Sequence, residues 1–81
     1  MASAEPADPR ISAFRRIVAT GQLGAVDGVP VDLFSAAHVV GIYEQLSPEA
    51  RVVFRRMSVE RMIEVAYDSR LRELRSRGRR Q

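Results

Sequence analysis

Helix-capping residues, prolines and glycines divide this chain of 81 residues into short segments. Asp8-Pro9 and Ser47-Pro48 each place a capping side chain directly before a proline, which is a common way for a helix to begin. Asp27-Gly28 lies between valines and favours a type I′ hairpin turn, because that turn needs a positive φ at both central residues. These signals predict a fold made of several short helices and one hairpin.

The first predicted helix follows Asp8 and ends at Gly21, which can adopt the left-handed conformation that terminates helices. Its apolar residues recur at helical spacing; they are Ile11, Phe14, Ile17 and Val18. Residues 1–8 are rich in alanine, proline and acids, so we expect a disordered lead-in there.

The second predicted element is a short β-hairpin near residues 23–33. Val29, Val31 and Leu33 alternate with other residues as in a half-buried strand. Pro30 argues against a central strand, but a two-residue turn places it in a pair that needs no hydrogen-bond donor. An isolated hairpin is marginally stable, so we expect this one to pack on helices.

Three more helices are expected, over roughly residues 36–46, 48–56 and 58–76. Asp32 or Ser35 can cap the first, and Ser47 and Ser58 cap the others. The apolar residues expected to face the core are Ala37, Val40, Tyr43 and Leu46, then Ala50, Val53, Phe54 and Met57, then Met62, Ile63, Ala66, Tyr67, Leu71 and Leu74. Gly41 is a weak point inside its helix, and Gly78 is the expected end of the last one.

The predicted fold class is therefore mainly α, a small bundle of about four helices with a short hairpin. We expect a single helical domain over residues 9–76 and a flexible arginine-rich tail over residues 77–81. A chain of this size has a small core, and a dimer would be one way to bury more surface.

The composition excludes several kinds of active site. The chain has no cysteine, no lysine and a single histidine. It therefore lacks a thiolate nucleophile, a Schiff-base lysine, a P-loop lysine and a site with several histidine ligands. Residues 1–8 do not read as a signal peptide, and no apolar run approaches the roughly 20 residues of a membrane span. We expect a cytoplasmic protein.

The polar residues that remain have simpler structural interpretations. A lone histidine such as His38 is more often a half-exposed helix residue than a general base. Asp27 and Asp32 are explained by a turn and a helix start rather than by a metal. We therefore predict a protein that is not an enzyme, with no catalytic, cofactor or metal site.

All thirteen basic residues are arginines, and they concentrate at the C-terminus. Residues 1–69 carry a net charge of −2, whereas residues 70–81 carry +5. Such a cluster is typical of proteins that bind phosphates of nucleic acids. The candidate residues for this alternative function are Arg70, Arg72, Arg75, Arg77, Arg79 and Arg80.

Two observations favour a protein partner over nucleic acid. Glu60, Glu64 and Asp68 recur every four residues and form an acidic stripe on the last helix, which would repel a phosphate backbone. The order of acids before arginines also suits the helix dipole. A helix-turn-helix function ranks lower than protein binding for two reasons. The last helix carries the acidic stripe, and it has no Asn or Gln placed to read bases.

Two stretches resemble one group of known proteins. Residues 27–36, DGVPVDLFSA, and residues 39–49, VVGIYEQLSPE, are similar to small uncharacterised proteins of bacteriophages that infect mycobacteria and related actinobacteria. The resemblance covers roughly residues 14–67 and contains no catalytic motif. It implies a phage source, the cytoplasm of the host cell and a GC-rich genome, which agrees with the use of arginine in place of lysine.

The function predicted from these observations is binding to another protein, either a host protein or a second copy of this chain. Four large side chains are candidate anchors, namely Tyr43, Phe54, Met57 and Tyr67, although Phe54 and Tyr67 suit the core better. The predicted partner-binding residues are Tyr43, Met57, Glu60, Glu64 and Asp68.

Overall fold

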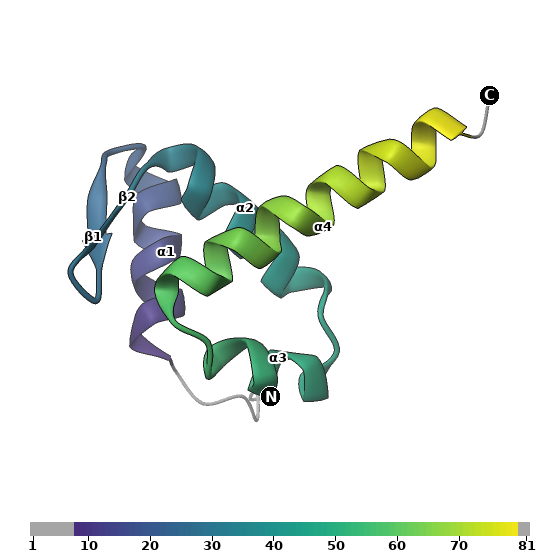
Figure 1. Cartoon of the computed structure of the whole chain (residues 1–81). Helices are drawn as coiled ribbons and strands as arrows, with labels where there is room; N and C mark the ends of the chain where they lie inside the picture. The colour runs from purple at the N-terminus through teal and green to yellow at the C-terminus, as the bar shows by residue number, and fades with distance from the viewer. Residues whose placement is uncertain (1–7, 80–81) are drawn as a thin grey trace.

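The chain folds into four helices and a two-stranded antiparallel hairpin (Figure 1). The computed structural model describes the backbone of residues 8–79 and the side chains of residues 8–69 and of Arg72. The elements in chain order are α1 (Pro9–Thr20), β1 (Gly24–Val26), β2 (Val29–Val31), α2 (Leu33–Gln45), α3 (Pro48–Arg55) and α4 (Val59–Arg79). The predicted fold class, a small and mainly helical bundle with a short hairpin, is confirmed.

Local capping explains where α1 begins and ends. The Asp8 carboxylate accepts hydrogen bonds from the backbone N–H groups of Arg10 and Ile11, at 2.9 and 3.3 Å. Gly21 has a φ of 70° and donates its N–H to the carbonyl of Ile17 at 2.8 Å. The rest of the predicted lead-in lies outside the described residues.

The hairpin forms at the predicted turn. Asp27 and Gly28 both have positive φ, 51° and 77°. Pro30 lies opposite Ala25, in a pair that needs no donor from proline. Gly24 lets β1 approach α1, since a Cβ there would lie 2.9 Å from Cγ1 of Ile17. The strand ends at Val31, however, so the expected extension of the alternation to Leu33 is wrong.

The three remaining helices begin at capping residues. Asp32, rather than Ser35, caps α2, which therefore begins three residues earlier than expected. Ser47 caps α3 with its side chain, and Ser58 accepts the N–H of Arg61 at 3.1 Å at the start of α4. The backbone stays helical through Gly78 to Arg79, three residues beyond the predicted bound of 76 and past the glycine that was expected to end the helix.

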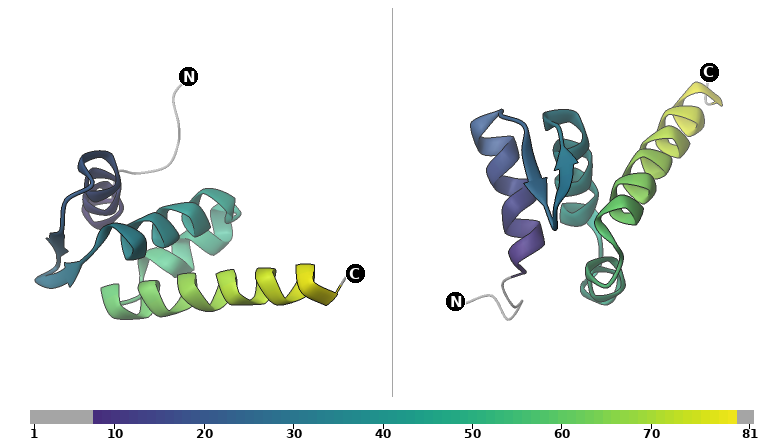
Figure 2. Two further views of the ribbon diagram at one scale, coloured as in Figure 1. Left: turned by 90° about the horizontal axis from the view of Figure 1, so that it is seen from above. Right: turned by 60° about the vertical axis from the view of Figure 1, so that its left-hand side comes forward.

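The core lies where α2 packs between α1 and α4 (Figure 2). Every element contributes to it, and the buried residues are Ile11, Phe14, Ile17, Val26, Val31, Ala36, Val39, Tyr43, Phe54, Val59, Met62 and Ala66. The hairpin covers one end of this core, and the C-terminal half of α4 projects from the other end (Figures 1 and 2). Within the described residues, no helix is long and apolar enough to cross a membrane.

In the first two turns of α2, the buried residues lie one position earlier in the sequence than predicted. The buried line is Ala36, Val39 and Tyr43, whereas Ala37 is exposed. On α3, Phe54 is buried but Val53 is exposed. These corrections arise because several faces of both helices are apolar in sequence, and the positions of α1 and α4 select which face is covered.

Candidate protein-binding face

Tyr43 was predicted to lie on the core line of its helix and was also a candidate partner contact. It lies in the core, so the second prediction is wrong. Only 2% of the residue is exposed, and its ring centroid lies 6.1 Å from that of Phe54. It occupies the buried line of α2, where α3 turns back against that helix. Phe54 is equally buried, so neither residue is available to a partner in this fold.

Arginines hold Tyr43 in place. The Arg51 guanidinium lies 4.6 Å from the ring centroid, and its Nε donates to the Tyr43 carbonyl at 2.9 Å. Arg55 donates to the Tyr43 hydroxyl at 2.7 Å, and Arg15 lies 5.9 Å from the ring. Arginines of α1 and α3 therefore stabilise the junction with α2, a role that the sequence pattern did not indicate.

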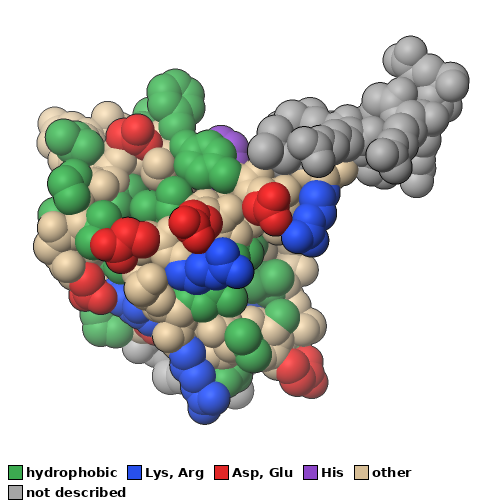
Figure 3. Space-filling view, in the orientation of Figure 1, with side chains coloured by type: hydrophobic (Ala, Val, Ile, Leu, Met, Phe, Trp, Pro, Cys, Tyr) green, Lys and Arg blue, Asp and Glu red, His purple; other side chains and the backbone are tan. Residues whose placement is uncertain are grey.

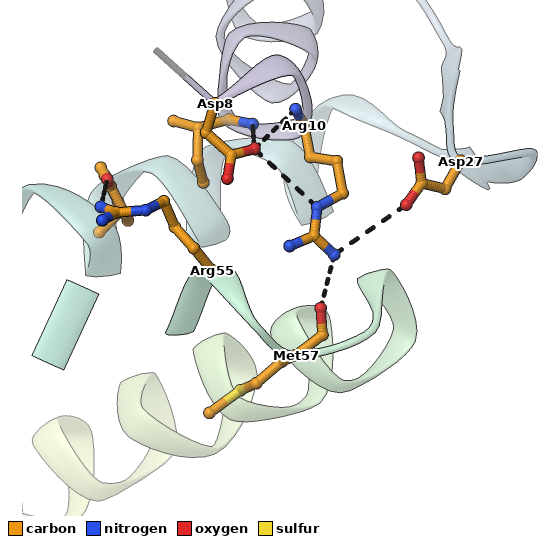
Figure 4. Close-up of polar contacts among 7 residues, drawn as sticks. Asp8, Arg10, Asp27, Arg55 and Met57 are labelled. Carbon is orange, nitrogen blue, oxygen red and sulfur yellow. Dashed lines mark hydrogen bonds and ion pairs between the residues drawn. The ribbon is translucent and has the colours of Figure 1, made fainter. Parts of the chain in front are cut away.

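Met57, another predicted contact, has a half-buried side chain and a backbone carbonyl that is already bound. Arg10 donates from Nη1 to that carbonyl at 2.6 Å and also lies near two carboxylates, Asp8 at 3.9 Å and Asp27 at 4.0 Å (Figure 4). Arg10 thus joins α1, the hairpin turn and the segment between α3 and α4. This contact gives Asp27 a structural role.

The most exposed aromatic residue in the described part of the chain is Phe34, at the start of α2. The residue is 71% exposed, and the carbonyl of Phe34 accepts a hydrogen bond from Nδ1 of His38 at 2.7 Å. The His38 ring stacks on Tyr67 of α4, with ring centroids 4.3 Å apart and planes inclined by 29°. We call these three residues the aromatic face.

One further contact fixes the aromatic face, and the tautomer of His38 follows from its bond to Phe34. The hydroxyl oxygens of Ser35 and Tyr67 lie 3.3 Å apart, so one donates to the other. Because a carbonyl only accepts, Nδ1 of His38 carries the hydrogen of the bond to Phe34, and in a neutral ring Nε2 is the acceptor. Hydrophobic side chains gather beside the histidine, where α2 begins (Figure 3).

The sequence indicated two residues of the aromatic face but did not predict that the three residues lie together. His38 was expected to be a half-exposed helix residue, which agrees with its intermediate exposure. Tyr67 was expected to suit the core, but 37% of it is exposed. Phe34 was missed, although it lies two residues before the buried Ala36, and so points away from the buried line of α2.

The start of α2 is electrostatically fixed by Asp32. Its carboxylate accepts the N–H of Ser35 at 2.7 Å. This backbone hydrogen bond, followed by one from the Ser35 side chain, lowers the pKa of Asp32. The lowered pKa means that the cap favours the ionised form and orders the turn that presents Phe34.

The predicted acidic stripe is exposed but is interleaved with arginines. Arg61 pairs with Glu64 at 3.0 Å, and Arg72 pairs with Asp68 at 2.8 Å. These four side chains line a shallow hollow on α4 together with Val65 and Ser69. Red and blue side chains accordingly alternate across the front of the molecule in Figure 3.

Most of the candidate nucleic-acid-binding side chains lie outside the described residues. These are Arg70, Arg75, Arg77, Arg79 and Arg80. Arg72 is described, is highly exposed and is paired with Asp68 on the same helix. Asp27 and Asp32, which were weighed as a metal pair, have separate partners, and the described part of the chain contains no cluster of metal-ligating side chains.

Comparison with models of protein families, with curated proteins and with solved structures gave no match. The assignment of a candidate site therefore depends on the geometry described above.

Proposed function

We propose that this chain is a small non-enzymatic protein that binds another protein through the aromatic face. The observation that supports it most is the exposure of Phe34 next to a stacked His38–Tyr67 pair. The stacked rings of His38 and Tyr67 are held in one orientation and therefore lose little conformational entropy on binding. Exposed aromatic residues such as Phe34 are frequent anchors of protein interfaces.

Exposed apolar side chains extend this face toward the hairpin. Leu23 precedes β1 and Leu33 follows β2, so both lie at the open end of the hairpin, and both are exposed. The acids of α4 border Tyr67, which gives the apolar centre a charged rim, as in many interfaces. In this proposal the protein acts in the cytoplasm of the cell that contains it, a phage-infected host if the sequence resemblance holds.

Site-specific crosslinking tests this proposal. A benzophenone amino acid replaces Phe34 in one variant and Val53 in a control variant, since Val53 is also exposed but lies on α3, on the other side of the molecule (Figure 1). We expect irradiation in cells to yield a protein adduct at position 34 and none at position 53. Equal adducts at both positions, or none at position 34, would reject the aromatic face.

Nucleic-acid binding by the C-terminal arginines is the second candidate function. The pairing of Arg72 with Asp68 weakens it in the described part of the helix. Nuclease treatment before irradiation separates the two functions. An adduct at position 34 that needs intact nucleic acid would favour the second function.

A further inference from the structure

The shape and charge of α4 indicate which kind of protein binds the aromatic face. This helix has 21 residues and is about 31 Å long. Its buried residues, among the side chains that the structure describes, are Val59, Met62 and Ala66, all in the N-terminal half. The C-terminal half projects from the body, away from the other helices, in Figures 1 and 2.

Charge is distributed unequally along α4. Residues 59–69 contain Glu60, Glu64 and Asp68 against one arginine, a net charge of −2. Residues 70–79 contain five arginines against Glu73, a net charge of +4. The helix dipole acts within the first and last turns, so it does not account for the charges near the middle.

An antiparallel copy of the same helix complements this distribution in both halves at once. The acidic half of each copy lies beside the basic half of the other, whereas a parallel copy would pair like charges. Such an arrangement is isologous, with a twofold axis near the middle of the helix.

The apolar positions of α4 agree with the same antiparallel arrangement and define which residues face each other. Ile63, Tyr67, Leu71 and Leu74 recur at helical spacing in the sequence. With position 67 on the twofold axis, position 63 of one copy faces position 71 of the other. Position 64, a glutamate, then faces position 70, an arginine.

We propose that the protein forms a homodimer through antiparallel pairing of α4, with Tyr67 at the twofold axis. This inference rests on the proposed function, because the pairing brings a second copy against Tyr67 and the aromatic face beside it. The Arg61–Glu64 ion pair does not oppose it, since both side chains are more than 60% exposed and Glu64 has room for a second partner.

A charge-swap experiment on the full chain tests the register. Glu64→Arg places arginine opposite Arg70 at two symmetric sites, and Arg70→Glu places glutamate opposite Glu64. We expect sedimentation equilibrium to show dissociation about tenfold easier for each variant alone. Mixing the two variants should restore the dimer, because both contacts then join opposite charges. Circular dichroism should show unchanged helix content.

The rescue cannot arise within one chain, since positions 64 and 70 lie on different sides of a helix. Glu49→Arg on α3 makes the same charge change away from α4, and it should leave the dimer unaffected. A wild-type monomer throughout the concentration series would overturn the proposal. The proposal would also be overturned if both variants formed the dimer as tightly as the wild type, or if mixing the two variants did not restore the dimer.

The crosslinking experiment separates this inference from the proposed function. A monomeric chain that forms an adduct with a different protein at position 34 would reject the homodimer and keep the aromatic face. A dimer that follows the charge swap but gives no adduct at position 34 would keep the α4 pairing and reject the aromatic face as a binding surface.

Discussion

The arginines at the junction of α2 and α3 differ from those on the outer side of α4. Arg51 and Arg55 bind backbone and hydroxyl oxygens of the buried Tyr43. Arg61 and Arg72 pair with carboxylates of their own helix and are largely exposed. The same side chain therefore stabilises the fold in one region and remains accessible to a partner in the other.

The difference follows from what each guanidinium can reach. At the junction, an arginine covers an aromatic ring and donates to carbonyl groups in the last turn of α2. On α4, water surrounds each ion pair, so the pair contributes little to stability. Position in the fold, rather than residue type, decides which arginines are structural.

Removing the ring at the centre of the junction is the largest change. Tyr43→Ala should cost about 3–5 kcal/mol, because it leaves a cavity beside Phe54 and removes the surface that Arg51 covers. A domain of this size has about that much stability in total. We expect loss of cooperative urea unfolding monitored by circular dichroism. Tyr43→Phe, which keeps the ring, is the control and should remain folded.

Replacing one arginine from each region tests the comparison directly. Arg51→Ala should lower the free energy of unfolding by about 1–3 kcal/mol, since it removes hydrogen bonds to the carbonyls of Tyr43 and Glu44. Arg61→Ala should change it by less than about 0.5 kcal/mol. Equal effects in urea unfolding would show that the two regions do not differ as described.

The smallest effect concerns the cap of α2 and depends on pH. The folded pKa of Asp32 is lowered, so its contribution to stability is complete above the unfolded pKa and is lost as pH falls through the folded value. Asp32→Asn keeps a capping side chain without the charge. Thermal unfolding should show the wild type more stable than Asp32→Asn at pH 7, with a smaller difference near pH 3. A difference that stays constant would contradict this cause.

Local signals in the sequence predicted the ends of most elements. Asp8, Ser47 and Ser58 cap helices as expected, and Gly21 ends α1 in the left-handed conformation. These predictions succeed because a cap or a turn involves atoms only a few residues apart. The start of α2 was left open between Asp32 and Ser35 because both have capping side chains.

Contacts between distant residues were not predictable in the same way. Tyr43 was expected on the core line of its helix and was also a candidate partner contact, and it is buried, whereas Tyr67 was expected to suit the core and is partly exposed. Both lie on apolar lines of their helices, so periodicity alone does not distinguish them. The distinction arises because α3 folds over Tyr43, whereas Tyr67 lies near the point where α4 leaves the body.

The sequence by itself determined the number of helices, the hairpin turn and the unequal charge of α4, since each depends on residues close together in the chain. Only the tertiary structure decided which apolar side chains are buried, which arginines stabilise the junction and how Phe34, His38 and Tyr67 meet. Those outcomes depend on the packing of α2 between α1 and α4, and that packing joins residues far apart in the chain, 29 positions in the Arg15–Glu44 contact and 32 in the Ser35–Tyr67 contact.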